Sequence, residues 1–282
     1  MTPLIATSLA SGSSGNALVL QYGADALLLD CGLPQRSIER ALRQSEIDPA
    51  TLRGVLLTHE HGDHACSAAP FAKRHGLPLV ASAPTLAAIG AQSAGLVTIA
   101  IAPDTIISLG SFRVECFHVA HDAAGPVGYC IAAGGWCVGI ATDLGAWDAS
   151  VAAALRMTDL LIVEANYDAE RLRLAPYNEV VKYRIAGSNG HLDNIDAARL
   201  IARIAADGRQ RTVWLAHLSQ EANSPQVAAR TVAGALRLAG ARPTPVFALP
   251  RRAPHTWSSE THARQLDLFP IASEEATDDW LG

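Results

Sequence analysis

Four potential metal ligands fall within six positions of the sequence: His59, His61, Asp63 and His64, in the run HEHGDH. The run follows directly on residues 54–58, an apolar segment typical of a buried strand. A loop at a strand end can turn the alternating His59 and His61 toward one metal ion, while Asp63 and His64, opening a helix, reach a second ion. The spacing therefore predicts a metal centre with hydrolytic chemistry, in preference to a histidine-rich surface loop.

Three more donors follow predicted strands elsewhere in the chain: His121 after residues 113–119, Asp143 after residues 136–142 and His217 after residues 212–216. Groups at the carboxyl ends of strands converge on one edge of an α/β sheet, where ligands usually bind. We therefore expect these three side chains to join the HEHGDH run at that edge. His118 competes with His121 because both lie near the end of one strand, although alternation places them on opposite faces.

The elements that must position these side chains are indicated by hydrophobic periodicity. Short apolar runs bounded by turn residues predict strands at residues 16–21, 26–30, 54–58, 77–81, 113–119, 127–132, 136–142, 160–164 and 212–216. Helical spacing ended by a glycine predicts helices at residues 194–206 and 225–239. Sheets flanked by helices make a layered α/β fold.

The composition argues against membrane, fibrous and disordered classes, because 49% of the 282 residues are hydrophobic and 17% are charged. The longest uncharged run, residues 123–142, contains Pro126 and a Gly134-Gly135 pair, so it predicts a hairpin rather than a membrane span. The five cysteines form no CxxC pair and are odd in number. They favour a reducing compartment, which predicts a cytoplasmic protein.

The formal net charge of −5 comes from the end of the chain. Residues 1–252 carry equal numbers of basic and acidic side chains, so charge neither favours nor excludes a polyanionic partner. These residues are predicted to form the metallohydrolase domain. Residues 253–282 are rich in Ser, Thr and acidic residues, which predicts a disordered acidic tail.

Several motifs resemble the metallo-β-lactamase superfamily: the THEHGDH loop, Asp30 in LLLDCG on an earlier strand, and the strand-terminal Asp143 and His217. The resemblance implies an α/β fold of four layers, the αββα sandwich, around a binuclear metal centre. The motifs SLASGSSGNA, HDAAGPVGY, ATDLG and AHLSQE look like the YycJ/WalJ branch, whose members are nucleases reported as DNA exonucleases. The likeness spans residues 5–249, which is most of the chain.

The resemblance also implies how the ligands divide between two ions: His59, His61 and His121 on one, Asp63, His64 and His217 on the other, and Asp143 bridging both. The branch motif favours His121 over His118 as the third ligand. An aspartate instead of a cysteine at the bridging position resembles phosphodiesterases and thioester hydrolases more than β-lactam-cleaving enzymes. Imidazole-rich sites suit zinc by ligand softness, with manganese or iron as alternatives.

Catalytic roles are predicted for Asp63 and for His191, which lies in GHLDN just before a helix. For His191 two interpretations stand side by side: a histidine of a capping loop, or the donor of the proton that a leaving oxygen requires. Asp30 and Glu164 are predicted to orient ligand imidazoles through the second ring nitrogen. Strand-end acids that bond to backbone amides are the alternative for both.

Substrate contacts are predicted at Ser13 and Asn16, because the turn SGSSGN offers hydroxyl and amide donors to a phosphate. A plain hairpin is the alternative. Asn166 is a third predicted contact. Where the branch has Asn-His-Asp, this sequence has Asn166-Tyr167-Asp168, so the histidine of the branch pattern is replaced by Tyr167. Tyr167 can replace that histidine as a hydrogen-bond donor but not as a base, because the ordinary pKa of tyrosine is about 10.

The tail contains an apolar island with the sequence QLDLF, made of Gln265, Leu266, Asp267, Leu268 and Phe269. It resembles the short peptide by which bacterial replication and repair proteins dock on the β sliding clamp. A leftover hydrophobic turn is the alternative. The leading hypothesis is a cytoplasmic, metal-dependent DNA exonuclease linked to replication or repair. Two other classes stay open: a small-molecule phosphodiesterase or glyoxalase-like thioester hydrolase, and a metal-binding clamp adaptor without turnover.

Overall fold

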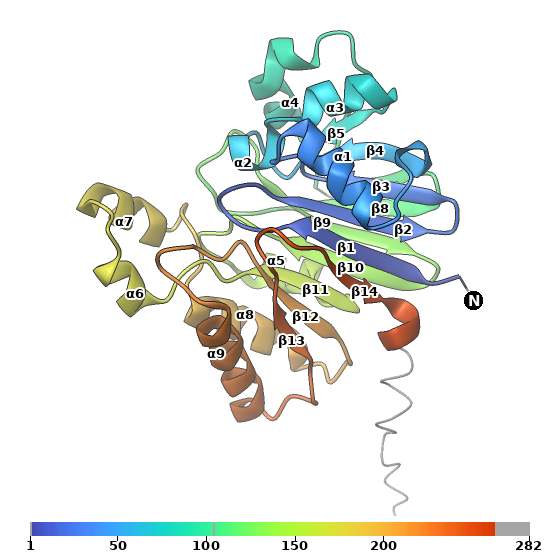
Figure 1. Ribbon diagram of the computed structural model, residues 1–282. Helices are drawn as coiled ribbons and strands as arrows, with labels where there is room; N and C mark the ends of the chain where they lie inside the picture. The colour runs from blue at the N-terminus through green and yellow to red at the C-terminus, as the bar shows by residue number, and fades with distance from the viewer. Residues whose placement is uncertain (1, 104, 263–282) are drawn as a thin grey trace, which may run out of the picture.

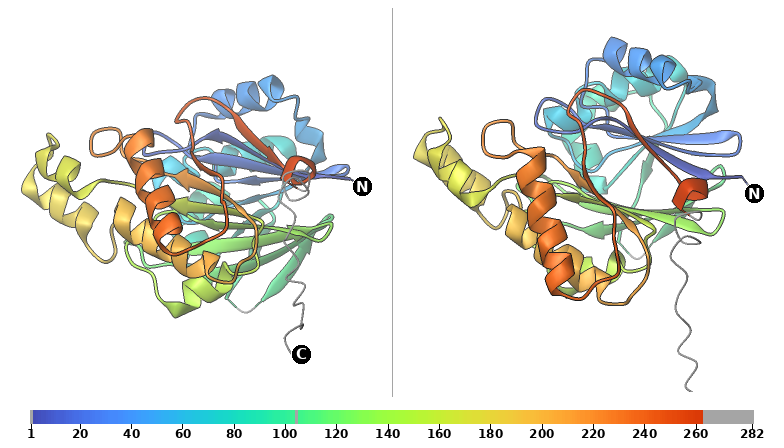
Figure 2. Two further views of the ribbon diagram at one scale, coloured as in Figure 1. Left: turned by 90° about the horizontal axis from the view of Figure 1, so that it is seen from below. Right: turned by 60° about the horizontal axis from the view of Figure 1, so that its bottom comes forward.

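Two β-sheets of seven strands each lie face to face in the computed structural model, which describes residues 2–103 and 105–262 (Figure 1). Helices cover the outer face of each sheet, so the layers run helix, sheet, sheet, helix. Figure 2 shows the same layers from two further directions. The expected αββα sandwich is confirmed.

The first sheet combines the N-terminal part of the chain with one late strand. Its strands are, in spatial order, β14 (His255–Ser258), β1 (Leu4–Ala10), β2 (Ala17–Tyr22), β3 (Asp25–Leu29), β4 (Leu52–Leu56), β5 (Leu79–Ala81) and β6 (Thr98–Ala100). Neighbours are antiparallel from β14 to β3 and parallel from β3 to β6. The residues that follow β3 and β4, including Asp30 and the HEHGDH run, therefore share one edge of the sheet.

The second sheet begins with a meander and ends with parallel strands. Its strands are, in spatial order, β13 (Val246–Ala248), β12 (Thr212–Ala216), β11 (Leu160–Glu164), β10 (Trp136–Ala141), β9 (Val127–Ala133), β8 (Phe112–His118) and β7 (Ile106–Leu109). The strands from β10 to β13 are parallel, and those from β7 to β10 are antiparallel. Asp143 and His217 follow the parallel strands β10 and β12 and so lie at the same edge.

The predicted hairpin is confirmed as β9 and β10. Its turn contains Gly134 and Gly135, which have φ angles of 60° and 85°. Two consecutive residues in the left-handed region match the twist of a two-residue hairpin loop, and glycine adopts this conformation without steric cost.

Helices make the outer layers. On the side of the first sheet lie α1 (Gln35–Gln44), α2 (Gly62–Ala65), α3 (Ala68–His75) and α4 (Ala83–Ile89), with 3₁₀ turns η1 (Pro49–Thr51) and η2 (Gly90–Ser93). On the side of the second sheet lie α5 (Ala149–Ala154), α8 (Asn194–Ala205) and α9 (Pro225–Leu238). The helices α6 (Ala169–Leu174) and α7 (Glu179–Ala186) project from the sandwich in every view (Figures 1 and 2). Among the described residues, no helix combines the length and hydropathy needed to cross a membrane.

The core between the sheets is apolar and closed. Phe112, Tyr129 and Trp214 are its largest fully buried side chains, and the Tyr129 hydroxyl donates to the Leu57 carbonyl at 2.7 Å, so its polar atom is satisfied. Strands β11 and β12 are buried along their whole length. They lie between the other sheet and the outer helices, which explains their continuous apolar sequences.

The folded body extends beyond residue 252, where the sequence analysis placed the start of a disordered tail. Residues 255–258 form β14, which pairs with β1 in the register Ile5 with Ser258 and Ser8 with His255. The predicted boundary was too early, because a strand of four residues among Arg, Pro and Ser carries too little periodicity to be detected. The QLDLF island, residues 265–269, lies outside the described residues.

Candidate metal centre

All seven predicted donors meet at one edge of the sandwich, where strands of both sheets end. Their ligand atoms fall into overlapping groups in which all atoms lie within 4.8 Å of one another. The groups are His59, His61 and His121; Asp63, His64 and His217; His59, His64 and Asp143; and Asp143, Glu164, His191 and His217. The first two groups match the two ligand sets implied by the resemblance. Asp143 contacts both sets, at 3.0 Å from His64 Nε2 and 3.7 Å from His121 Nε2.

The short helix α2 contains the second half of the HEHGDH run. Its first turn closes with the His64 amide donating to the His61 carbonyl at 2.9 Å. The chain just after β3 holds this turn in place, because the Cys31 amide donates to the His64 carbonyl at 2.6 Å. A Cβ atom on Gly32 would overlap the Asp63 carbonyl, so the close approach of these two segments requires glycine.

Three strand ends at this edge adopt a left-handed backbone conformation. Asp30, Asp143 and His217 have φ angles of 58°, 54° and 53°, and among the described non-glycine residues only Glu46 also has a positive φ. Such conformations cost on the order of 1–3 kcal/mol each and persist where the surrounding structure imposes them. Each one turns a side chain from the end of its strand into the cluster.

Asp30 fixes the orientation of the His64 ring. Its Oδ2 accepts from His64 Nδ1 at 2.8 Å, while Oδ1 accepts from the Thr58 amide at 2.9 Å. The Nδ1 proton thereby leaves Nε2 of His64 facing the centre, 3.0 Å from Asp143. Burial lowers the pKa of His64, but Asp143 and Asp30 outweigh burial and raise it well above its usual value. Both expected roles of Asp30, orienting an imidazole and accepting from backbone, are present.

Glu164 orients two further imidazoles from a fully buried position. Its Oε1 accepts from Nδ1 of His191 at 2.7 Å and from Nδ1 of His217 at 3.0 Å. Its Oε2 accepts from the Leu144 amide at 2.8 Å. Both carboxylate oxygens are therefore used inside the protein, while Nε2 of His217 points to Asp63 Oδ2 at 3.2 Å. Glu164 therefore orients the rings of His191 and His217 through their Nδ1 atoms, and the Nε2 atom of His217 remains directed at the cluster.

The charges in the cluster shift pKa values in opposite directions. Burial, followed by the nearby His64, lowers the pKa of His59 to about 2, so this imidazole is neutral. Burial also lowers the pKa of His217, but the carboxylates around it, Asp143 first, outweigh burial and raise it to about 10. The cluster thus attracts positive charge, which a proton or a metal cation can supply.

One buried atom of the cluster, His59 Nε2, lacks any hydrogen-bond partner, and Asp143 Oδ2 has only the ring nitrogen His64 Nε2 beside it, at 3.0 Å. An unsatisfied buried polar group costs about 1–3 kcal/mol, and more when it is charged. A neutral imidazole nitrogen and a carboxylate oxygen are donors that zinc, manganese and iron accept. The residues therefore fit a divalent metal ion.

The structure separates the two histidines that compete at the end of β8. His121 is buried, and its Nδ1 donates to the Gly190 carbonyl at 2.9 Å, which leaves Nε2 directed at the cluster, 3.3 Å from His61. His118 is exposed to solvent. His191 also lies against the cluster, where its Nδ1 donates to Glu164 Oε1 at 2.7 Å. A residue of a capping loop does not require this contact to a buried carboxylate.

The predicted substrate contacts divide into two buried amides and one exposed hydroxyl. Asn16 Nδ2 lies 3.0 Å from His64 Nε2, and its Oδ1 accepts from the Gly12 amide at 2.8 Å. Asn166 Nδ2 donates to the His217 carbonyl at 2.8 Å. These contacts make both asparagines supports of the ligand loops, whereas Ser13 is exposed on its turn.

Tyr167, which replaces the histidine of the branch pattern, does not point its ring into the cluster of ligands. It packs in a small apolar cluster with Leu172, Ala175 and Ala222. Burial raises the pKa of its hydroxyl to about 12.

Several supporting residues escaped the sequence analysis. Ser11 Oγ accepts from the His217 amide at 2.9 Å, and Asn223 Nδ2 donates to the carbonyls of Ala165 and Asn166 at 2.9 and 3.1 Å. Ser11 lies in the predicted SGSSGN turn, so its place in that motif was a signal in the sequence. Asn223 had none, because its partners, the carbonyls of Ala165 and Asn166 and the side chain of Asn194, belong to distant segments.

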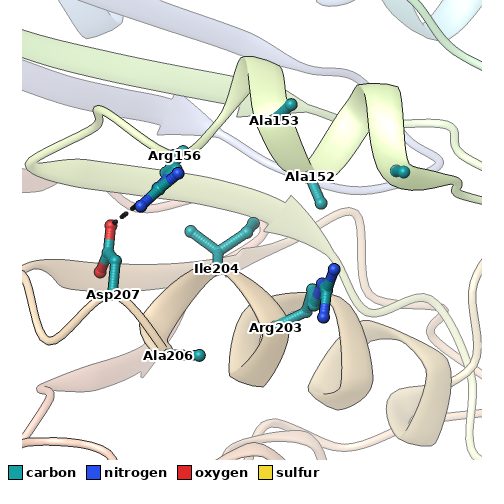
Figure 3. A pocket seen from close by; sticks show the side chains of 8 residues that line it. Ala152, Ala153, Arg156, Arg203, Ile204, Ala206 and Asp207 are labelled. Atoms are coloured by element: carbon teal, nitrogen blue, oxygen red, sulfur yellow. Dashed lines mark ion pairs between the residues drawn. The ribbon is translucent and has the colours of Figure 1, made fainter.

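A second hollow lies at the opposite edge of the second sheet, where α8 leads toward the start of β12 (Figure 3). It has a volume of about 320 Å³ and lies between α5 and α8. Arg156 reaches across it to Asp207 at 3.9 Å, over a floor of alanines and Ile204. None of the predicted site residues lines it, so the chemistry concentrates at the other edge.

The comparison with protein families agrees with this geometry. Residues 26–218 match the family model described as "Beta-lactamase superfamily domain", which covers more than half of the chain. The chain belongs to the metallo-β-lactamase superfamily and is an enzyme of the metal-dependent hydrolase class.

Within that class, the chain is similar to two proteins named as exodeoxyribonucleases. It is 31% identical to YycJ of Bacillus anthracis, over 82% of this chain and 89% of that protein. It is 32% identical to WalJ of Streptococcus pneumoniae, over 81% of this chain and 86% of that protein. Among solved structures, the metallo-β-lactamase fold protein YhfI of Bacillus subtilis superimposes with a TM-score of 0.69 at 19% identity, covering 91% of this chain and 99% of that one, which supports the fold.

Proposed function

We propose that the protein is a binuclear-metal phosphodiesterase that degrades DNA from an end. The observation that carries this proposal is the meeting of two three-residue donor groups with Asp143 between them. In this arrangement His59, His61 and His121 would hold one divalent ion, Asp63, His64 and His217 would hold the other, and Asp143 would serve both sets. Zinc or manganese suits these nitrogen and oxygen donors, with iron as a further candidate.

DNA as the substrate is supported by the two relatives named as exodeoxyribonucleases, which the chain matches over most of its length. The aspartate at the bridging position suits this chemistry. When bound, the two cations activate water and neutralise the charge of a phosphodiester during in-line displacement. Since residues 1–252 are neutral overall, the cations of the centre would supply much of the attraction for the strand.

The chain's own residues then supply orientation and protons. Asp63 is the most exposed of the site carboxylates, with 27% of its side chain accessible against 4% for Asp143, so it is placed to orient the attacking water. His191 donates a proton to the departing oxygen through Nε2, because Glu164 occupies its Nδ1 at 2.7 Å. Burial lowers the pKa of His191, but Glu164 outweighs burial and the net shift is upward, which favours the proton-bearing form.

The tail motif extends the proposal to replication-linked repair in the cytoplasm. Residues 265–269 would dock on the β sliding clamp and so bring the enzyme to DNA. Binding of the full chain to purified clamp, compared with Leu268→Ala, tests this part alone. Equal affinity of the two proteins removes the clamp from the proposal and leaves the hydrolase intact.

The decisive experiment compares end-labelled single-stranded and duplex DNA with bis-p-nitrophenyl phosphate. The metal-loaded protein is expected to shorten labelled DNA progressively from an end, and Asp143→Asn is expected to be inactive. Hydrolysis of the small phosphodiester with no degradation of DNA would identify a small-molecule phosphodiesterase, and thioester cleavage alone a glyoxalase-like hydrolase. Metal binding with no turnover on any of them would identify the adaptor.

A further inference from the structure

The helices α6 and α7 and the turn between them, residues 169–186, form an arm that contributes no residue to the donor groups of the metal centre. The arm exposes Leu174, Val180, Val181 and Tyr183 to solvent. Tyr183 is 84% exposed, the most accessible aromatic side chain of the described residues. Clustered exposed apolar side chains mark interaction surfaces, whereas single ones are ordinary.

A hollow of about 700 Å³ opens between the two helices of the arm. Its apolar lining comes from Tyr167, Leu172, Val180 and Tyr183. Tyr167 is only 7% exposed and belongs to the body of the protein. Flat aromatic rings beside aliphatic walls suit a planar, uncharged group, and every nucleobase has such a face.

The arm carries more positive than negative charge. Residues 169–186 contain four basic side chains, Arg171, Arg173, Lys182 and Arg184, and two acidic ones, Glu170 and Glu179. In the pair of Arg173 with Glu170 both groups are exposed, and in the pair of Lys182 with Glu179 the carboxylate is exposed while Lys182 is 18% exposed. Ion pairs that water reaches contribute at most about 1 kcal/mol. A phosphate can therefore exchange with these carboxylates at little cost.

Backbone and side-chain contacts join the arm to the metal centre. The guanidinium of Arg184 pairs with Asp122 at 2.6 Å, and Asp122 lies 3.4 Å from Nε2 of His121. The His191 amide donates to the Ile185 carbonyl, at the end of α7, at 2.9 Å. The C-terminal end of α7 therefore lies beside the metal centre.

We propose that the hollow of the arm receives an unpaired nucleobase of the strand being degraded, stacked on Tyr183, while Arg184 contacts the phosphate between that base and the centre. This inference rests on the proposed phosphodiesterase function and names its substrate more closely, as a strand end with at least one unpaired nucleotide. The aromatic ring gives stacking without sequence preference, as a degrading enzyme requires.

The test measures fluorescence anisotropy of end-labelled oligonucleotides whose phosphorothioate linkages resist cleavage, with the metal-loaded full chain. Tyr183→Ala is expected to weaken binding of single-stranded oligonucleotides about 5- to 100-fold. Tyr183→Phe keeps the ring and is expected to restore most of the affinity. Leu238→Ala, which truncates an equally exposed side chain on α9, is the matched control and is expected to bind like the wild type.

An abasic nucleotide moved step by step along the oligonucleotide identifies the stacked position. At one position it should weaken binding by the wild type, with no further loss in Tyr183→Ala. Unchanged affinity of Tyr183→Ala, or equal losses at every abasic position, would overturn the inference. Sedimentation of a dimer that Tyr183→Ala dissociates would also overturn it, in favour of a second copy of this chain. Anisotropy reads binding without cleavage, so an inactive wild type on DNA and bis-p-nitrophenyl phosphate would instead count against the proposed function.

Discussion

The metal-centre edge and the α6–α7 arm lie next to each other and are built in opposite ways. At the edge, Asp30, Glu164 and His64 are buried, and each makes several polar contacts. On the arm, α7 has no buried residue, and both ion pairs have an exposed carboxylate, that of Glu170 or Glu179. Pre-organised chemistry requires fixed ligand geometry, whereas contact with a variable strand requires accessible side chains. The proposed reactivity of the edge and the proposed substrate contact of the arm agree with this difference.

The largest expected effect comes from the bridging position. Asp143→Asn keeps the shape and tolerates the left-handed backbone, since asparagine is enriched there, but it removes the charge between the two ligand sets. Metal-dependent cleavage should fall to background while circular dichroism stays unchanged, and metal content measured by mass spectrometry should drop. Asp196→Asn, on the accessible side of α8, is the matched control. Cleavage at the wild-type rate by Asp143→Asn would refute the assignment of this edge as the centre.

The next effect tests proton donation. His191→Ala should lower kcat about 100- to 10,000-fold, because general acid catalysis contributes on this order, while metal content is retained. His118→Ala, at an exposed histidine at the end of β8, should have the wild-type kcat. The rates are measured on labelled DNA at saturating substrate. Equal rates for the two variants would reduce His191 to a structural residue.

A smaller effect is expected at the orienting carboxylate of His64. Asp30→Asn should weaken metal affinity about 10- to 100-fold, because partners of ligand imidazoles typically contribute this much. A competition titration against a chromophoric chelator measures the affinity. Asp25→Asn, at the other end of the same strand, removes an aspartate that pairs with Arg53 and should leave the affinity unchanged. If both variants bind metal alike, the hydrogen bond to His64 has no influence on the centre.

The smallest effect is expected on the arm. Val180→Ser should change the free energy of unfolding by no more than about 0.5 kcal/mol, because Val180 is exposed. Leu56→Ala, in the core under the edge, should cost about 2–5 kcal/mol. Urea denaturation of both proteins gives the comparison. A large loss in Val180→Ser would show that the arm packs as firmly as the edge, contrary to the contrast drawn above.

Much of the edge could be predicted because its residues are concentrated in the sequence. Four donors lie within six positions at His59 to His64, while Asp143 and His217 follow apolar runs that end buried in the structure. The strand-end rule then brings Asp143 and His217 to the same edge. The strand-end rule does not predict which side chains contact each other at the edge, such as Asp143 with His64 or His217 with Asp63.

The arm and β14 could not be predicted for the opposite reason. Their helices and strand have between four and eight residues, which is too short for a periodic pattern to exceed chance. The left-handed conformation of Asp30, Asp143 and His217 is equally invisible, because tertiary contacts and not residue type impose it. Sequence patterns thus identify the donor residues, whereas the contacts that hold these residues in place and the exposure of the arm depend on the assembled fold.

The pairing of β14 with β1 has a consequence for the synthesis of the chain. β1 is an interior strand of the finished sheet, yet one of its two neighbours consists of residues 255–258. During translation, the free side of β1 therefore stays unprotected until almost the whole polypeptide has left the ribosome. An open strand edge is a template for pairing with other chains. Incomplete chains that end before residue 255 are consequently expected to aggregate and to bind chaperones more than the full chain does.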